Sequence, residues 1–288
     1  MAFEDVIGKM SQWATGAEAM AALGAVLRMR QQGITPPPEV AAALDGVLTA
    51  AGIGDLDELA PPQIGALAGM VGMYVGQINE LLADPGRAPG WTYTDPAILD
   101  GYGRGSAMLP AVMAQAHPDL ASITSFLDVG TGVGLLACAA ANVWPKAMVV
   151  GIDPWDTSLT RARVNVDAAG LGDRVTLRQT ELADLGETDA YDCGWIPSFF
   201  LTEDVLATGL RTALAALRPG GWVVVGTSRP QPDPLADAVG TLRWIRGGGS
   251  LLDPKGAVTL LEQAGFADAH VAPPTAPIPL DLVLGRKA

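Results

Sequence analysis

The second half of the chain alternates between short apolar runs and longer segments with helical periodicity. Strands rich in Val, Ile and Leu that alternate with helices predict parallel βαβ units, in which helices cover both faces of the sheet. The apolar runs span 125–130, 147–153, 175–179, 191–196 and 221–227. After a helix at 257–266, two strands within 268–274 and 279–286 lie close enough in sequence to pair antiparallel. The pattern therefore predicts an α/β fold built on a mostly parallel sheet.

The chain up to about residue 88 shows helical patterns instead. Segments 16–32, 36–52 and 61–86 each read as a helix, and the last two have Pro at the start and Gly at the end, as helices often do. The third contains Gly65, Gly69, Gly72 and Gly76. Because glycine costs roughly 1 kcal/mol in a helix interior, we expect another helix or a partner chain to approach this one closely. A linker rich in Pro and Gly at 83–96 and a helical segment at about 96–116 lead to the first strand.

Composition narrows the classes of partner. The net charge of −13 arises from 31 acidic and 18 basic residues, without a dense basic cluster, which argues against nucleic acid or an anionic membrane as partner. No apolar run reaches the length of about 18 residues that a membrane span needs. Cys138 and Cys193 have no second Cys or His at metal-ligand spacing, so we expect no metal site and a reduced, cytoplasmic location.

A glycine-rich turn follows the first strand. Asp128 precedes Gly130, Gly132 and Gly134, at the strand end where open α/β sheets bind ligands. The spacing is G-x-G-x-G rather than the dinucleotide fingerprint G-x-G-x-x-G, and the charge of Asp128 would repel a pyrophosphate. Asp153 ends the second strand, where such folds hold ribose hydroxyls by a carboxylate. Together these features favour a nucleoside with a positively charged tail.

Five segments resemble, in order and spacing, those of the class I S-adenosylmethionine-dependent methyltransferases. They are "LDVGTGVG", "GIDPW", "RVTLRQTEL", "YDCGWIPSFF" and "LRPGGWVVVGTS". The resemblance covers about residues 124–286. Within this family, the chain is similar to the bacterial small-molecule methyltransferases that have an N-terminal helical cap. It implies a Rossmann-like seven-stranded sheet, mostly parallel with the last strand antiparallel, and S-adenosylmethionine as cofactor. We accordingly predict a helical cap and dimerisation region at 1–90, a linker and helix closing the active site at 91–123, and the cofactor-binding domain at 124–288.

The resemblance also implies roles for individual residues. Asp128 and Gly130 would lie near the methionine amino group and Gly132 close to the cofactor, Asp153 would bind the ribose, and Trp155 would cover the adenine. Glu181 would meet the adenine amine, although the family usually has a Gly-Asp pair where this chain has Thr180 and Glu181. Ile196, followed by Pro197, would lie beside the methyl group. The predicted cofactor set is completed by Thr131, Gly134, Pro154, Leu182 and Arg104, the last assigned to the cofactor's carboxylate.

Aromatic residues gather in the segments expected around the acceptor. They favour a flat, largely apolar acceptor, such as an aromatic or indole-like metabolite. We expect the substrate pocket to contain Trp91, Trp195, Phe199, Phe200 and Trp244. Tyr93 and Tyr102 are the catalytic candidates, because a hydroxyl could hydrogen-bond and orient the acceptor. His117 and His270 have no carboxylate orienter recognisable in the sequence.

The sequence therefore predicts a methyltransferase that acts on a small molecule by in-line transfer, in secondary metabolism. The acceptor atom, whether O, N or C, stays open. The "IPSFF" segment lacks the Asn-Pro-Pro-aromatic motif typical of amine and amide methylation, which argues against nucleic-acid bases and protein amides as acceptors. A homodimer is expected from the apolar N-terminal helices. The alternatives are a nicotinamide-dependent oxidoreductase and a catalytically inactive cofactor-binding partner subunit.

Overall fold

The computed structural model describes residues 2–274 and 280–288, which form two compact units. The first unit contains the chain up to Ala83 together with Asp95–Gly105, and the second contains Asp84–Thr94 and Ser106–Ala288. These units divide the chain differently from the predicted boundaries after residues 90 and 123. Most of the expected linker belongs to the second unit, whereas the helical segment that follows it is divided between the two units at Ser106.

The first unit is entirely helical in its regular structure. Its elements are α1 (Phe3–Gln32), α2 (Pro38–Ala50), η1 (Leu56–Glu58), α3 (Pro61–Ala83) and α4 (Pro96–Ser106). The first helix begins well before the predicted residue 16, with Glu4 and Asp5 in its first turn, where acidic side chains favour the helix dipole. It ends at Gly33, whose φ of +64° suits a glycine cap.

Glycines let the helices of this unit approach closely, as predicted. A Cβ at Gly69 would overlap the side chain of Arg104, and one at Gly76 would lie 2.7 Å from Ile98 Cγ1. Both contacts come from α4. Gly101 of α4 in turn faces α3, where an added Cβ would lie 2.6 Å from the Gly69 carbonyl oxygen. The expected close partner is therefore a helix of the same unit.

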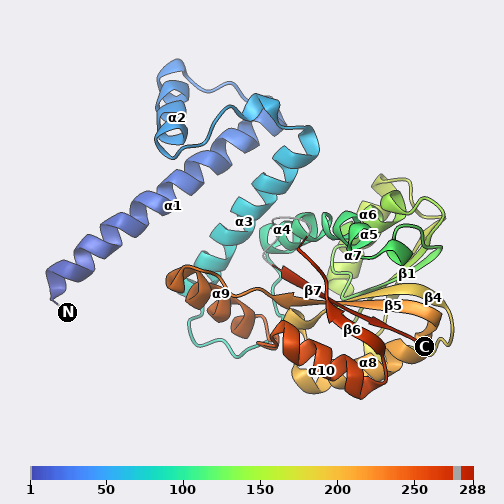
Figure 1. The fold of residues 1–288 in the computed structure, drawn as a ribbon. Helices are drawn as coiled ribbons and strands as arrows, with labels where there is room; N and C mark the ends of the chain where they lie inside the picture. Colours follow the sequence, from blue (N-terminus) through green and yellow to red (C-terminus); the bar gives the residue numbers. More distant parts are fainter. Residues whose placement is uncertain (1, 275–279) are drawn as a thin grey trace. The chain divides into compact units, whose positions relative to one another are not determined.

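The second unit is built on a seven-stranded sheet (Figure 1). The order is β3-β2-β1-β4-β5-β7-β6, in which β7 runs antiparallel to both neighbours and the other neighbouring pairs are parallel. This confirms the predicted fold class and the C-terminal hairpin. The strands are β1 (Ser125–Val129), β2 (Met148–Asp153), β3 (Val175–Gln179), β4 (Tyr191–Pro197), β5 (Leu217–Ser228), β6 (Ala267–Val271) and β7 (Leu280–Arg286). The expected start of the last strand at Pro279 lies outside the described residues.

Helices cover both faces of this sheet (Figure 1). Buried residues of α5 and α6 pack on one face, and those of α8 and α10 on the other. The helices are α5 (Leu109–Ala116), α6 (Leu135–Val143), α7 (Asp156–Ala168), α8 (Glu203–Ala216), α9 (Pro234–Arg246) and α10 (Pro254–Ala264). The short turns are η2 (Pro118–Leu120), η3 (Leu182–Asp184) and η4 (Ser198–Phe200). The helix expected over 96–116 is two helices, α4 and α5. Pro110 lies in the first turn of α5, where its missing N–H is tolerated.

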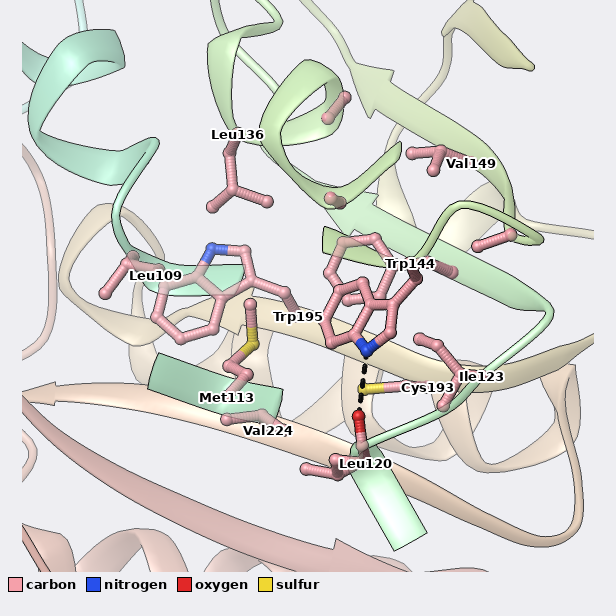
Figure 2. Packing of buried hydrophobic residues seen from close by; sticks show 14 of the residues in the cluster. Leu109, Met113, Leu120, Ile123, Leu136, Trp144, Val149, Cys193, Trp195 and Val224 are labelled. Carbon is pink, nitrogen blue, oxygen red and sulfur yellow. Dashed lines mark hydrogen bonds between the residues drawn. The ribbon is translucent and has the colours of Figure 1, made fainter. Parts of the chain in front are cut away.

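The core on the α5–α6 face contains three buried tryptophans, of which Figure 2 labels Trp144 and Trp195. Trp144 donates its indole N–H to the carbonyl oxygen of Leu120 at 2.8 Å, which satisfies the polar atom of an otherwise apolar contact. Trp195 lies among Leu109, Met113 and Leu136 and is 3% exposed. No helix among the described residues is both long and apolar enough to cross a membrane.

The contact of α4 with α3 gives a test of the first unit. Gly101→Ala would press its methyl group into backbone atoms of α3 that cannot rotate away, so we expect a loss of about 1–3 kcal/mol in stability and a lower Tm. Gly105→Ala in the same helix meets open space and should keep or raise the Tm. Thermal unfolding of the two variants side by side measures the difference. Equal Tm values would contradict the close packing of α4.

Candidate active site

The predicted turn joins the end of β1 to α6. Gly130, Gly132 and Gly134 have φ angles of +67°, +55° and +75°, which residues with a side chain rarely adopt. The backbone N–H of Thr131 donates to the Ile152 carbonyl at 3.0 Å, so the turn is attached to the end of β2. The glycines thus bring exposed backbone to the carboxyl edge of the sheet, as the sequence predicted.

Asp128 lies beneath this turn and is 1% exposed. The Thr131 hydroxyl donates to its carboxylate at 2.7 Å. Burial raises the pKa of the Asp128 carboxyl to about 7; the Thr131 bond opposes this shift and the nearby Asp153 charge adds to it. A carboxylate in such surroundings is costly unless it gains a partner with positive charge.

Asp153 accepts hydrogen bonds from both loops at this edge. The N–H of Gly132 donates to one carboxylate oxygen at 2.9 Å, and the N–H of Trp155 donates to the other at 2.9 Å. Burial raises the pKa of Asp153 above its ordinary value, although these two N–H bonds lower it. No cation is among the groups that set the pKa of Asp128 or Asp153. These two hydrogen-bond acceptors therefore fit the amine and hydroxyls of S-adenosylmethionine, which donate, better than phosphate groups.

The loop beyond β2 and β3 carries the predicted adenine contacts. Trp155 is 37% exposed, and the Gln179 side chain fixes the neighbouring loop by donating to the Pro154 carbonyl at 3.1 Å. Glu181 is exposed at the start of η3, whereas the side chain of Leu182 is buried against Gly209 of α8. Only the backbone of Leu182 could then face a cofactor. A depression of about 190 Å³ flanks this loop; its lining residues are Arg178–Thr180 and Asp184–Glu187.

The end of β4 lies beside the glycine turn. Pro197 Cγ is 3.6 Å from where a Cβ on Gly130 would lie. Ile196 is buried in the α8–α10 core and Trp195 in the opposite core, so neither presents its side chain freely at the sheet edge. Trp195 was expected in the substrate pocket, but strand alternation directs it into the core.

The other four predicted pocket residues come together, and Tyr93 joins them. Trp91 lies 4.5 Å from Phe200 and 5.1 Å from Tyr93 between ring centroids. Phe199 lies 4.7 Å from Phe200 and 4.9 Å from Trp244. We call these five residues the aromatic cluster. They come from three separate segments: the 84–94 segment, η4 and α9.

Two further predicted residues lie in the first unit. Tyr102 accepts a hydrogen bond from the Gln77 side chain at 2.6 Å. Arg104, which was assigned to the cofactor's carboxylate, is in the last turn of α4 and packs its side chain on Gly69. Each role stays a prediction.

Both histidines of the chain lie at the other end of the sheet. His117 and His270 are 6.4 Å apart between ring centroids and lie 4.4 Å and 6.0 Å from Trp222. Trp222 pairs with Cys193, which pairs with Phe126 near the start of β1. Neither histidine is therefore near the glycine turn.

The comparisons with known proteins agree with this geometry. Residues 126–221 match the family model described as "Methyltransferase domain". The chain contains a methyltransferase domain. A release factor glutamine methyltransferase from Rhodopirellula baltica is 46% identical over 63 residues, which are 22% of this chain and 21% of that protein. The chain spans less than a third of the length of the first curated relatives that it matches.

Solved structures match over almost the whole chain. Human N-acetylserotonin methyltransferase in complex with S-adenosylmethionine is 15% identical, covers 100% of both chains and gives a TM-score of 0.68. The pyocyanin biosynthetic protein PhzM is 19% identical, covers 99% of this chain and 98% of its own, and gives a TM-score of 0.67. The likeness shows a shared fold, including N-terminal helices. Together with the domain match it confirms the likeness to the methyltransferase fold and the enzyme class of the domain.

Three residues of this unit escaped sequence analysis. Gln179 reaches back to the Pro154 loop, and Arg87 and Arg246 bind backbone atoms near the aromatic cluster. The sequence offered two signals for the arginines. Arg87 is a cation in a Pro/Gly linker, and Arg246 directly precedes the run Gly247–Gly249 at the end of a helix.

The buried Asp128 predicts an unusual dependence of stability on pH. Its pKa rises from an ordinary 3.8 to about 7, so the folded protein holds the proton more tightly than the unfolded chain does. Ligand-free protein should therefore lose stability as pH rises from about 4 to about 7. Asp128→Asn removes the charge, and we expect its Tm to exceed that of the wild type at about pH 8 and to approach it near pH 4. Thermal unfolding across this range, with Asp173→Asn as the exposed control, measures the effect, and parallel curves would contradict it.

Proposed function

We propose that this protein transfers a methyl group from S-adenosylmethionine to a small aromatic acceptor. The carrying observation is a pair of buried carboxylates, Asp128 and Asp153, at a glycine turn that directly adjoins the end of β4. From that strand end the chain continues into Phe199 and Phe200 of the aromatic cluster. A site for a cationic nucleoside and a stacking surface therefore belong to one edge of the sheet.

Each group at the edge has a role in holding the cofactor. S-adenosylmethionine supplies a methyl group on a positively charged sulfur, which leaves as a neutral thioether. Asp128 would accept from the methionine ammonium, and Asp153, whose oxygens retain lone pairs, would accept from the ribose hydroxyls. Trp155 offers an indole face for the adenine, and Glu181 offers an acceptor for its amine. Pro197 and the backbone of Ile196 would border the methyl group.

The aromatic cluster supports a flat acceptor. Trp91, Phe200 and Trp244 are partly exposed, so their rings offer stacking faces rather than only core contacts. The name of one structural neighbour identifies its acceptor as N-acetylserotonin, and another serves pyocyanin biosynthesis. The release factor enzyme acts on a protein, but its likeness covers only 63 residues. We infer an aromatic metabolite as acceptor and a place in secondary metabolism, in a reduced cytoplasmic setting that suits the two free cysteines.

Histidine takes no part in the proposed reaction, because both histidines lie beside Trp222. Alignment of donor and acceptor then supplies most of the rate, as expected for an in-line displacement that needs no base when the acceptor is already nucleophilic. Tyr93, which lies against Trp91, would orient an acceptor held on the aromatic cluster.

We also propose a homodimer formed through α1. The first half of this helix is exposed, and Phe3, Ile7, Met10 and Trp13 follow one another at helical spacing with exposed fractions of 74%, 47%, 58% and 53%. On α3, Val75, Ile78 and Leu82 make a second exposed apolar row. Apolar rows of this length on a helix surface are typical of interfaces.

Cofactor binding tests the proposed function directly. Calorimetric titration should show that S-adenosylmethionine and S-adenosylhomocysteine bind and that NAD does not. Asp153→Ala should weaken binding at least about tenfold, because ribose hydroxyls lose their acceptor, which corresponds to about 1.4 kcal/mol. Asp173→Ala, an exposed carboxylate in the turn after α7, should bind like the wild type. Binding of NAD alone would reverse the assignment in favour of an oxidoreductase.

The dimer has its own test. Met10→Glu places a charge in the exposed row of α1, and light scattering should show that it shifts the protein from dimer to monomer. Gln12→Glu on the same helix adds the same charge outside that row and should leave the dimer intact. A monomeric wild type would refute the dimer.

A further inference from the structure

The 84–94 segment has no helix or strand of its own, yet it is attached to the end of α9 by two arginines. Arg87 Nη2 donates to the carbonyl oxygen of Arg246 at 2.9 Å, and the N–H of Gly90 donates to the same oxygen at 3.1 Å. In return, Arg246 Nη2 donates to the carbonyl oxygen of Asp84 at 3.0 Å. Each arginine thus binds backbone on the other's segment.

Arg87 also sets the shape of its own segment. Its Nη1 donates to the Gly90 carbonyl at 2.7 Å and to the Thr92 hydroxyl at 2.9 Å. The guanidinium carbon lies 4.9 Å from the centroid of the Tyr93 ring, within the range of a cation–π contact. A planar group with several N–H donors can make these bonds at once, which a lysine ammonium cannot do in the same geometry.

Glycines after α9 let its C-terminal end approach the backbone of the 84–94 segment and of η4 closely. Gly248 has a φ of +80°, and an added Cβ would lie 2.7 Å from Gly90 Cα. A Cβ on Gly249 would overlap the backbone carbonyl of Phe199. The next residue, Ser250, donates its N–H to the Leu201 carbonyl at 2.9 Å. Backbone from three segments therefore meets without intervening side chains.

These three segments are the ones that carry the aromatic cluster. Trp91 follows Gly90 directly, Phe199 and Phe200 form η4, and Trp244 precedes Arg246 by two residues in α9. The position of Trp91 on Phe200 thus depends on how the 84–94 segment is attached to α9. The position of Trp244 on Phe199 depends on the close contact of Gly249 with the Phe199 backbone. The attachment contains no atom of the glycine turn, Asp128 or Asp153.

We propose that Arg87 and Arg246 are positioning residues that set the acceptor-binding face by holding Trp91 on Phe200. This inference rests on the proposed function, since it names the residues that shape the acceptor side of the same site. The arginines act on acceptor binding and leave cofactor binding unchanged. They determine specificity through the spacing of aromatic rings rather than by contact with the acceptor.

The test compares, in one set of variants, the affinity for S-adenosylhomocysteine, the product of the cofactor, with the affinity for aromatic probes of the acceptor site. Calorimetry measures the binding of S-adenosylhomocysteine, and then of 1-naphthol and 5-hydroxyindole to the protein saturated with it. Arg87→Met and Arg246→Met should each weaken binding of the aromatic probes about tenfold or more, with the affinity for S-adenosylhomocysteine unchanged. Arg87→Lys keeps the charge but not the fork of donors, so it should lose an intermediate part of the affinity.

Matched controls separate positioning from general damage. Arg211→Met removes an exposed arginine of α8, and Gly240→Ala adds a methyl group to α9 in open space; both should bind every ligand like the wild type. Gly248→Ala should reproduce the loss for the aromatic probes, because its methyl group pushes the 84–94 segment away. This variant keeps the inference testable if an arginine variant does not fold.

Each remaining outcome has one meaning. Wild-type protein that does not bind S-adenosylhomocysteine would refute the proposed function. Wild-type protein that binds it but neither probe would refute the stacking face and the inference with it. Arginine variants with unchanged probe affinity, or with equal losses for probe and S-adenosylhomocysteine, would overturn the positioning role alone.

Discussion

The Asp153 carboxylate organises the binding edge of the sheet. It accepts from Gly132 in the turn after β1 and from Trp155 in the loop after β2, so one side chain fixes two loops relative to each other. The Thr131 bonds to Asp128 and to the Ile152 carbonyl complete the connection. Glycines can adopt many backbone conformations. This set of bonds stabilises the one conformation that leaves the backbone of the turn open to a ligand.

The same arrangement explains why the site is costly without a ligand. Two carboxyl groups on neighbouring strands, both bonded to the glycine turn, are removed from water, and burial shifts the pKa of both upward. A ligand that carries positive charge and hydroxyl donors lowers this cost, whereas a phosphate would increase it. Under the proposed function, the buried carboxylates lower the stability of the ligand-free protein and favour a cationic nucleoside, a trade-off that is common at functional sites.

Much of the sheet could be predicted because its strands are continuous apolar runs. For β3 the predicted limits, 175–179, are those observed. The turn was also predictable, because Asp128 and three glycines have fixed offsets from β1. The early start of α1 was missed although Phe3, Ile7, Met10 and Trp13 recur at helical spacing; these side chains are exposed and belong to no core. Trp195 is buried in the core, which could not be foreseen because nothing in "CGWIP" tells which face of β4 a residue occupies. The attachment of Arg87 to Arg246 joins residues 159 positions apart, a distance over which sequence pattern carries no information.

The chain passes between its two units more than once, since residues 84–94 belong to the sheet-containing unit and Asp95–Gly105 to the helical one. Removing everything before Ser106 would therefore delete Arg87, Trp91 and Tyr93 from the unit that was meant to be kept. Exchange of N-terminal regions between related proteins, whether in the laboratory or by gene recombination, would likewise carry part of the acceptor side with it. Under the proposed function, variation in the helical region and variation in the choice of acceptor would then be inherited together.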